Sequence, residues 1–189
     1  MKFYSDNQVD RIVAPLLPEF GYAVDVGAND GLILSNSLHF EDKGWYVLCV
    51  EPNPELAGVG RKRRKLWREL ACGAEDHDAM PFTYYGGYPY ASNSSLGPRH
   101  GYMSNHAGIT SQVKVRRLDT LLEEAGFPRL DYLTIDVEGW EQEVLAGLSL
   151  DRWQPLVIVS EDLFGKYPSP PGYDEVGRYE FDRVFQRKA

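Results

Sequence analysis

Short apolar runs alternate with amphipathic stretches along most of the chain. The runs have the length and the β-branched and aromatic content of buried strands, and they lie at residues 22–26, 45–50, 69–72, 131–135 and 155–160. The stretches between them carry apolar residues at helical spacing, over residues 32–42, 54–68, 118–125 and 139–148. Strands that alternate with helices predict an α/β fold, a mostly parallel sheet covered on both faces.

Three parts of the chain depart from this alternation. Residues 81–108 are rich in Gly, Tyr, Ser and Asn and are predicted to form a long loop, of the kind that usually serves function. Residues 112–117 alternate like a strand. After the Pro-rich link 165–172, residues 173–179 and 182–187 predict a closing antiparallel hairpin.

Composition limits the classes of protein that the chain can represent. With 189 residues and 43% hydrophobic side chains, we expect a single globular domain over residues 1–189. The net charge of −8 disfavours a general nucleic-acid partner, because phosphate contacts need a positive face. No apolar run approaches the roughly 20 residues that span a bilayer, so no membrane is expected. Two cysteines without a C-x-x-C motif and a polar N-terminus indicate a cytoplasmic protein.

The most informative motif is the segment 24–31, Val-Asp-Val-Gly-Ala-Asn-Asp-Gly. It lies between a predicted strand and a predicted helix, where open α/β sheets bind their ligands and where glycine lets a ligand approach the backbone. Glu51 follows 20 residues after Gly31, at the end of the second predicted strand. An acid at that place can accept hydrogen bonds from both hydroxyls of a ribose.

The spacing of the glycines separates two classes of nucleoside ligand. Dinucleotide-binding turns read G-x-G-x-x-G and hold a pyrophosphate, whereas here Gly27 and Gly31 are four residues apart. The carboxylates of Asp25 and Asp30 would repel a pyrophosphate and would favour a ligand with a sulfonium and an ammonium group. The motif therefore favours S-adenosylmethionine over NAD. A plain tight turn is the alternative, and Glu51 at this spacing argues against it.

Five segments resemble the FkbM-type S-adenosylmethionine-dependent methyltransferases. They are VDVGANDG (24–31), SNSLHFE (35–41), CVEPNP (49–54), RLDTLL (117–122) and DYLTIDVEGWEQEVLAGL (131–148), in the order of the family. The resemblance implies a Rossmann-like class I methyltransferase fold, with a mostly parallel seven-stranded sheet and a C-terminal antiparallel hairpin. It also implies O-methylation of a hydroxyl on a sugar, glycan or small metabolite. The Pro-rich link replaces a helix usual in the family, so a homo-oligomer could complete the pocket.

The resemblance and the motif together assign the cofactor-binding residues. We expect the glycine turn to frame the methionine part of the cofactor, through Asp25, Gly27, Asn29, Asp30 and Gly31. Glu51 is expected to hold the ribose, and Asn53 to lie near the adenine. Cys72 and Gly73, at the end of the third predicted strand, are expected to border the adenine pocket.

Acidic side chains at the ends of later strands are the candidates for catalysis. Asp136 ends the fourth strand of the predicted sheet, where it can act as base, orient the substrate hydroxyl or bind the ammonium of the cofactor. Glu138 and, in the long loop, His106 are the other catalytic candidates. Asp136, Glu138 and Glu161 together with a histidine could hold Mg²⁺, although no metal is predicted as a requirement. The alternative is that these acids only stabilise the starts of helices, through the helix dipole.

Other features support competing functions. Residues 61–68 (RKRRKLWR) hold six basic residues and could mark a nucleic-acid methyltransferase, although a solvated helix end explains them as well. Tyr84, Tyr85, Tyr88 and Tyr90 could form a wall on which a sugar stacks. A non-catalytic protein that keeps the fold is the third hypothesis. We expect a small-molecule or carbohydrate acceptor.

Overall fold

The computed structural model of the chain describes residues 2–85, 94, 96, 108–163, 165 and 167–189. The strands are β1 (Tyr22–Val26), β2 (Tyr46–Val50), β3 (Leu66–Arg68), β4 (Ala71–Cys72), β5 (His77–Tyr84), β6 (Ile109–Arg116), β7 (Tyr132–Ile135), β8 (Val157–Glu161), β9 (Tyr173–Tyr179) and β10 (Asp182–Arg187). The α-helices are α1 (Val9–Val13), α2 (Leu38–Asp42), α3 (Pro54–Gly60), α4 (Leu118–Glu124), α5 (Glu141–Ala146) and α6 (Leu150–Trp153). Two short 3₁₀ turns, Asp6–Gln8 and Ala14–Leu16, flank α1.

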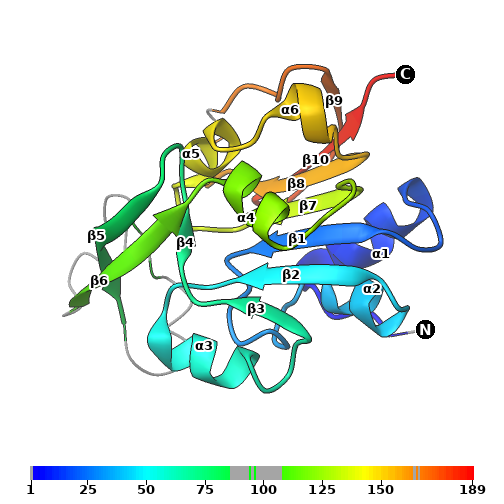
Figure 1. Ribbon diagram of the computed structural model, residues 1–189. Coiled ribbons are helices and arrows are strands. Elements are labelled where there is room, and N and C mark those ends of the chain that lie inside the picture. The colour runs from blue at the N-terminus through cyan, green and yellow to red at the C-terminus, as the bar shows by residue number, and fades with distance from the viewer. Residues whose placement is uncertain (1, 86–93, 95, 97–107, 164, 166) are drawn as a thin grey trace.

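The main sheet has seven strands in the order β3-β2-β1-β7-β8-β10-β9 (Figure 1). The first five run parallel, and β10 and β9 complete the sheet as an antiparallel hairpin. The predicted fold class is therefore confirmed. A smaller sheet, β4-β6-β5, lies beyond the carboxyl ends of β1 and β2 (Figure 1).

Alternate side chains of the central strands enter two separate hydrophobic clusters, one on each face of the sheet. In β1, Val24 and Val26 pack with Leu121 of α4 and Val144 of α5. Ala23 of the same strand packs on the opposite face, where the first three helices lie. Both faces are thus covered, which is why the strands read as unbroken apolar runs in the sequence.

Two predicted helices are shorter than the apolar spacing indicated. The helix expected over 54–68 ends at Gly60, where the ring of Trp67 lies only 2.1 Å from the position that a Cβ would take. The helix expected over 32–42 begins at Leu38, because Leu34 has a left-handed backbone (φ +56°) that an α-helix excludes. Residues 66–68, expected to be helical, form strand β3 instead.

Strand placement around the third strand of the main sheet was also predicted wrongly. The third strand is β3 rather than residues 69–72, and Ala71–Cys72 pairs with β6 in the smaller sheet. The long loop expected from residue 81 is shorter at its start, because β5 runs through Tyr84 and pairs antiparallel with β6. The alternation in 77–84 was obscured by exposed polar residues on both faces of this outlying strand.

The basic run 61–68 does not form one charged face. Arg64 is buried, and its guanidinium donates to Glu41 Oε2 at 2.5 Å and to Ser37 Oγ at 2.8 Å. Arg61 and Arg63, in contrast, pair with separate acids at the surface. The exposed Arg61, Lys62, Arg63 and Lys65 follow the end of α3, as the helix-end interpretation of this run predicts. The buried Arg64 departs from it and stabilises the interior.

We predict that Arg64→Met strongly destabilises the fold. The substitution leaves Glu41 and the neighbouring Asp25 carboxylate, 4.0 Å from the guanidinium, in a buried position without their cation. Loss of one partner of a buried ion pair costs about 3–5 kcal/mol. Denaturant unfolding measures this cost, with Arg61→Met as the matched control, because the Arg61 side chain is 58% exposed. Equal stability of the two variants would contradict the role given to Arg64.

The turn after β1 crosses the end of β7 at very close range. A Cβ added to Gly27 would lie 1.7 Å from the carbonyl oxygen of Asp136, and Gly27 has φ +83°. The backbone is fixed on both sides, since Gly27 N donates to Val50 O at 2.9 Å and Asp136 N donates to Val26 O at 3.0 Å. Only glycine allows this crossing.

Gly27→Ala is therefore expected to destabilise the protein by about 4 kcal/mol or more, the range of severe single substitutions. Gly172→Ala is the matched control, because Gly172 has φ +82° with no atom within 4 Å of an added Cβ. It should cost only the strain of a left-handed alanine, about 1–2 kcal/mol. Thermal or denaturant unfolding of both variants separates the overlap from the strain.

Candidate active site

A large cavity opens at the carboxyl ends of β1, β2 and β7. Its volume is about 1030 Å³ with the open mouth included, at the upper end of the range of ligand pockets. The glycine turn, Glu51 and Asp136 all line it. The parallel pairing of the three strands places these segments on one edge, as open α/β sheets require of a ligand site.

The glycine turn contributes backbone and one polar side chain to the cavity. Gly27 and Asn29 line it, and Asn29 has a left-handed backbone with φ +55°. Asp30 has another task, because its Oδ1 accepts from the amides of Leu32 and Ile33 and fixes the chain after the turn. Asp30 and Gly31 are not among the described residues that line the cavity.

Asp25, the last-but-one residue of β1, lies at the floor of the cavity. It accepts a hydrogen bond from Ser37 Oγ, and Arg64 lies 4.0 Å away. Burial raises the pKa of the Asp25 carboxyl above its ordinary value, and the Arg64 charge opposes that rise. Asp25 therefore contacts both the cavity and the buried group formed by Arg64 and Ser37.

Two backbone hydrogen bonds hold the carboxyl group of Glu51 in place. Its two oxygens accept separate backbone hydrogen bonds, from Asn29 N at 3.1 Å and from Asn53 N at 2.8 Å. These bonds fix the carboxylate between the glycine turn and the start of α3. Burial raises the pKa of Glu51 to about 8, and the two backbone bonds moderate the rise.

The residues expected around the adenine occupy different positions. Cys72 lines the cavity, whereas Gly73 lies just behind it against Val115 and Trp140. Asn53 caps α3 by accepting from Glu55 N, and its Nδ2 donates to Ser94 Oγ at 3.3 Å. Ser94 does line the cavity, so Asn53 reaches the site through a neighbour.

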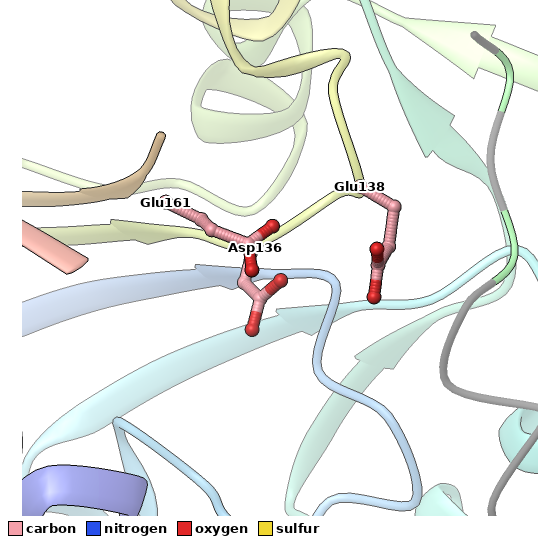
Figure 2. Close-up of side chains that lie close together, drawn as sticks. All are labelled: Asp136, Glu138 and Glu161. Carbon is pink, nitrogen blue, oxygen red and sulfur yellow. The ribbon is translucent and has the colours of Figure 1, made fainter. Parts of the chain in front are cut away.

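Three carboxylates gather where β7 and β8 end (Figure 2). One oxygen each from Asp136, Glu138 and Glu161 lies within 4.8 Å of the others. Enclosure by protein raises the pKa of Asp136 well above its ordinary value, and the charges of neighbouring acids add to the effect. Burial and the nearby Asp136 raise the pKa of Glu161 in the same way. The described residues add no histidine to this group.

The remaining predictions concern His106 and the four tyrosines of the expected sugar-stacking wall. His106, Tyr88 and Tyr90 are outside the described residues. Tyr85 is buried, and neither Tyr84 nor Tyr85 is among the described residues that line the cavity.

Sequence reasoning missed several residues of the cavity. Phe82 of β5 lines it, as do Leu96 and the pair Ile33 and Leu34. Phe82 was hidden because exposed residues obscure the alternation of β5. The pair was hidden by an apparent helix, because its side chains fit helical spacing equally well.

Comparison with known proteins now identifies the family. The methyltransferase FkbM domain matches residues 25–186, nearly the whole chain. The chain belongs to the FkbM methyltransferase family. Four of the five segments that resembled this family in the sequence contribute residues to the cavity, and RLDTLL (117–122) does not.

Individual relatives of this FkbM methyltransferase-family chain are distant. It is 28% identical over 171 residues to methyltransferase sdnD of Sordaria araneosa, a match that covers 73% of this chain and 64% of that protein. It is 28% identical over 158 residues to 2-O-methyltransferase NoeI of Sinorhizobium fredii, covering 76% of this chain and 64% of the relative. The chain thus spans less than two thirds of these relatives.

A solved structure shares the fold of this FkbM-family chain. The crystal structure of the FkbM methyltransferase from Methylobacillus flagellatus matches with a TM-score of 0.50 at 16% identity, over 78% of this chain and 35% of that one. Among the described residues, no helix is long and apolar enough to cross a membrane.

Glu51 makes the stability of this family member pH-dependent. Its carboxyl has a pKa of about 8 in the folded protein and an ordinary value of 4.5, so the folded state retains a proton that the unfolded chain releases between these values. Stability therefore falls as pH rises through this window. In Glu51→Gln this contribution is absent, so the stability of the variant relative to the parent should rise from pH 5 to 8 and then level off.

Urea unfolding at a series of pH values measures this difference. The exposed Glu124→Gln is the control and should give a difference that does not change over this window. A flat difference for Glu51→Gln as well would show that the Glu51 proton is not held in the folded state.

Proposed function

We propose that the protein is an S-adenosylmethionine-dependent O-methyltransferase that acts on a hydroxyl of a sugar, glycan or small metabolite. The observation that carries the proposal is one cavity whose wall holds the glycine turn, Glu51 and Asp136 together. Family membership supports it, and the printed name of one relative, 2-O-methyltransferase, agrees with transfer to oxygen.

The donor set of the cavity fits the cofactor. Glu51, oriented by two backbone amides, offers its carboxyl oxygens to the ribose hydroxyls. Gly27 of the glycine turn lines the same cavity without a side chain. The described lining contains acids and no Lys, Arg or His, an environment that suits a sulfonium and an ammonium group and disfavours a pyrophosphate. When bound, S-adenosylmethionine would supply an electrophilic methyl group.

Asp136 is proposed to receive the proton of the acceptor hydroxyl. Its carboxyl lines the cavity at the end of β7, and burial raises its pKa, so its ionised form is a stronger base than the carboxylate of a free aspartate. Glu138 lies beside it and also lines the cavity, where it can accept a hydrogen bond from the same hydroxyl. Together the two residues would orient the acceptor and remove its proton.

The two competing functions have less support. A nucleic-acid methyltransferase would use the basic run 61–68, but Arg64 of this run is buried and Arg61 and Arg63 pair with acids. A binding protein without activity does not require Asp136 to face the cavity. Asp136 and Glu138 favour an enzyme.

Calorimetric titration with S-adenosylmethionine, S-adenosylhomocysteine and NAD tests the proposal first. Both adenosyl ligands should bind, and NAD should not. Transfer is then measured with radiolabelled cofactor and a panel of neutral glycosides. Binding of NAD, or binding of no ligand, would refute the cofactor assignment, and cofactor binding without transfer to any hydroxyl compound would favour the non-catalytic alternative.

Two substitutions are expected to separate binding from transfer. Glu51→Ala should weaken binding of S-adenosylhomocysteine by about tenfold or more, as expected for loss of the hydrogen bonds to the two ribose hydroxyls. Asp136→Asn should leave that affinity within about threefold and reduce the transfer rate by about 10²-fold or more, the usual contribution of a general base. Asp151→Asn, on the exposed surface of α6, is the control for both measurements. Unchanged cofactor affinity in Glu51→Ala would remove the ribose assignment.

A further inference from the structure

Three consecutive aliphatic side chains are exposed beside the mouth of the cavity. Leu32, Ile33 and Leu34 are 37%, 40% and 52% exposed, and the last two line the cavity itself. We call Ile33 and Leu34 the apolar rim. Exposure of large apolar side chains in a contiguous group marks a binding surface more often than isolated exposure does.

The apolar rim is held in place at a conformational cost. Asp30 Oδ1 accepts from Leu32 N at 2.9 Å and from Ile33 N at 2.8 Å, and Asp30 Oδ2 pairs with Arg63 at 2.9 Å. Leu34 has φ +56°, a conformation that costs a non-glycine residue about 1–2 kcal/mol, and it bridges to Ser5. Strain that persists in a fixed segment beside a site is typical of a functional role.

The deeper part of the cavity has the opposite character. Asp25, Glu51, Asp136 and Glu138 all line it. No Lys, Arg or His lines the cavity within the part of the chain that the structure describes. Arg64, the nearest buried cation, is occupied by Glu41 and Ser37. A phosphate or carboxylate on the acceptor would therefore meet acidic side chains and, among the described residues, no compensating cation.

We propose that the acceptor is amphipathic and bears no anionic group near its hydroxyl, with an aliphatic portion that packs on Ile33 and Leu34 while the hydroxyl reaches Asp136. This inference rests on the proposed function and narrows its substrate class to neutral compounds such as alkyl-substituted or lipid-linked glycosides. The continuity of the apolar rim with the cavity selects this occupant over a second protein, because both side chains face the space in which transfer takes place.

The test uses n-butyl, n-hexyl and n-octyl β-glucoside below their micelle concentrations. Each is titrated into the protein saturated with S-adenosylhomocysteine, and n-octyl phosphate serves as the anionic probe with the same chain. Affinity should rise about threefold or more for each two methylenes, because each methylene leaves water on binding. Octyl phosphate should bind at least about tenfold more weakly than octyl glucoside.

The double variant Ile33→Ser/Leu34→Asn should abolish the dependence on chain length and leave the affinity for S-adenosylhomocysteine unchanged. Asparagine tolerates the left-handed backbone of residue 34, so the fold is preserved. Leu32→Ser is the matched control, since this neighbouring side chain is equally exposed but lies outside the cavity lining. It should retain the dependence.

Several outcomes would overturn the inference. These are affinity that does not depend on chain length, tight binding of octyl phosphate, and no binding by any glucoside. A dimer in sedimentation velocity that the double variant dissociates would assign the apolar rim to a second copy of the chain and also overturn it. Failure of S-adenosylhomocysteine to bind in the first titration would instead refute the proposed function, so the two failures are distinguishable.

Discussion

The site depends on one close approach between backbones, where the turn after β1 crosses the end of β7. The carbonyl of Asp136 occupies the space that a side chain at residue 27 would need. The crossing brings the turn and the Asp136 carboxylate into one wall, and β2, paired on the other side of β1, adds Glu51. Because the carboxyl ends of parallel strands share an edge, three residues distant in the sequence meet there.

Burial of the acids at this edge disfavours folding. Only some of them have a cation nearby that offsets this cost. Asp25 is supported by the buried Arg64, which also pairs with Glu41 and fixes the segment after the glycine turn. Asp136 and Glu161 have no such cation among the described residues, and burial together with the charges of neighbouring acids raises their pKa values. Carboxylates left poorly compensated at a cavity are typical of sites where a ligand completes the environment.

Much of the fold could be predicted from the sequence, because burial on both faces leaves unbroken apolar runs in the central strands. The hairpin of β9 and β10 was predicted with its bounds. Prediction failed over 54–84, where tertiary contacts override local pattern. Trp67 packs where Gly60 has no side chain, and Arg64 is drawn inward by Glu41, which no spacing of basic residues reveals.

The acids and glycines of the candidate site stood at strand ends in the sequence, and this position made them recognisable. The position at a strand end reveals neither the hydrogen bonds that Asp30 accepts from the following amides nor the exposure of the apolar rim. Both depend on a turn in which an aspartate side chain replaces the first hydrogen bonds of a helix. Apolar residues that follow such a turn fit helical spacing and nevertheless stay exposed.

A crystal structure with S-adenosylhomocysteine tests the central claim most directly, that the edge shared by β1, β2 and β7 is the cofactor site of a methyltransferase. The account predicts that both ribose hydroxyls lie within hydrogen-bond distance of Glu51 and that the sulfur faces the Asp136 carboxylate. A ligand bound outside this cavity, or one whose ribose points away from Glu51, would contradict it.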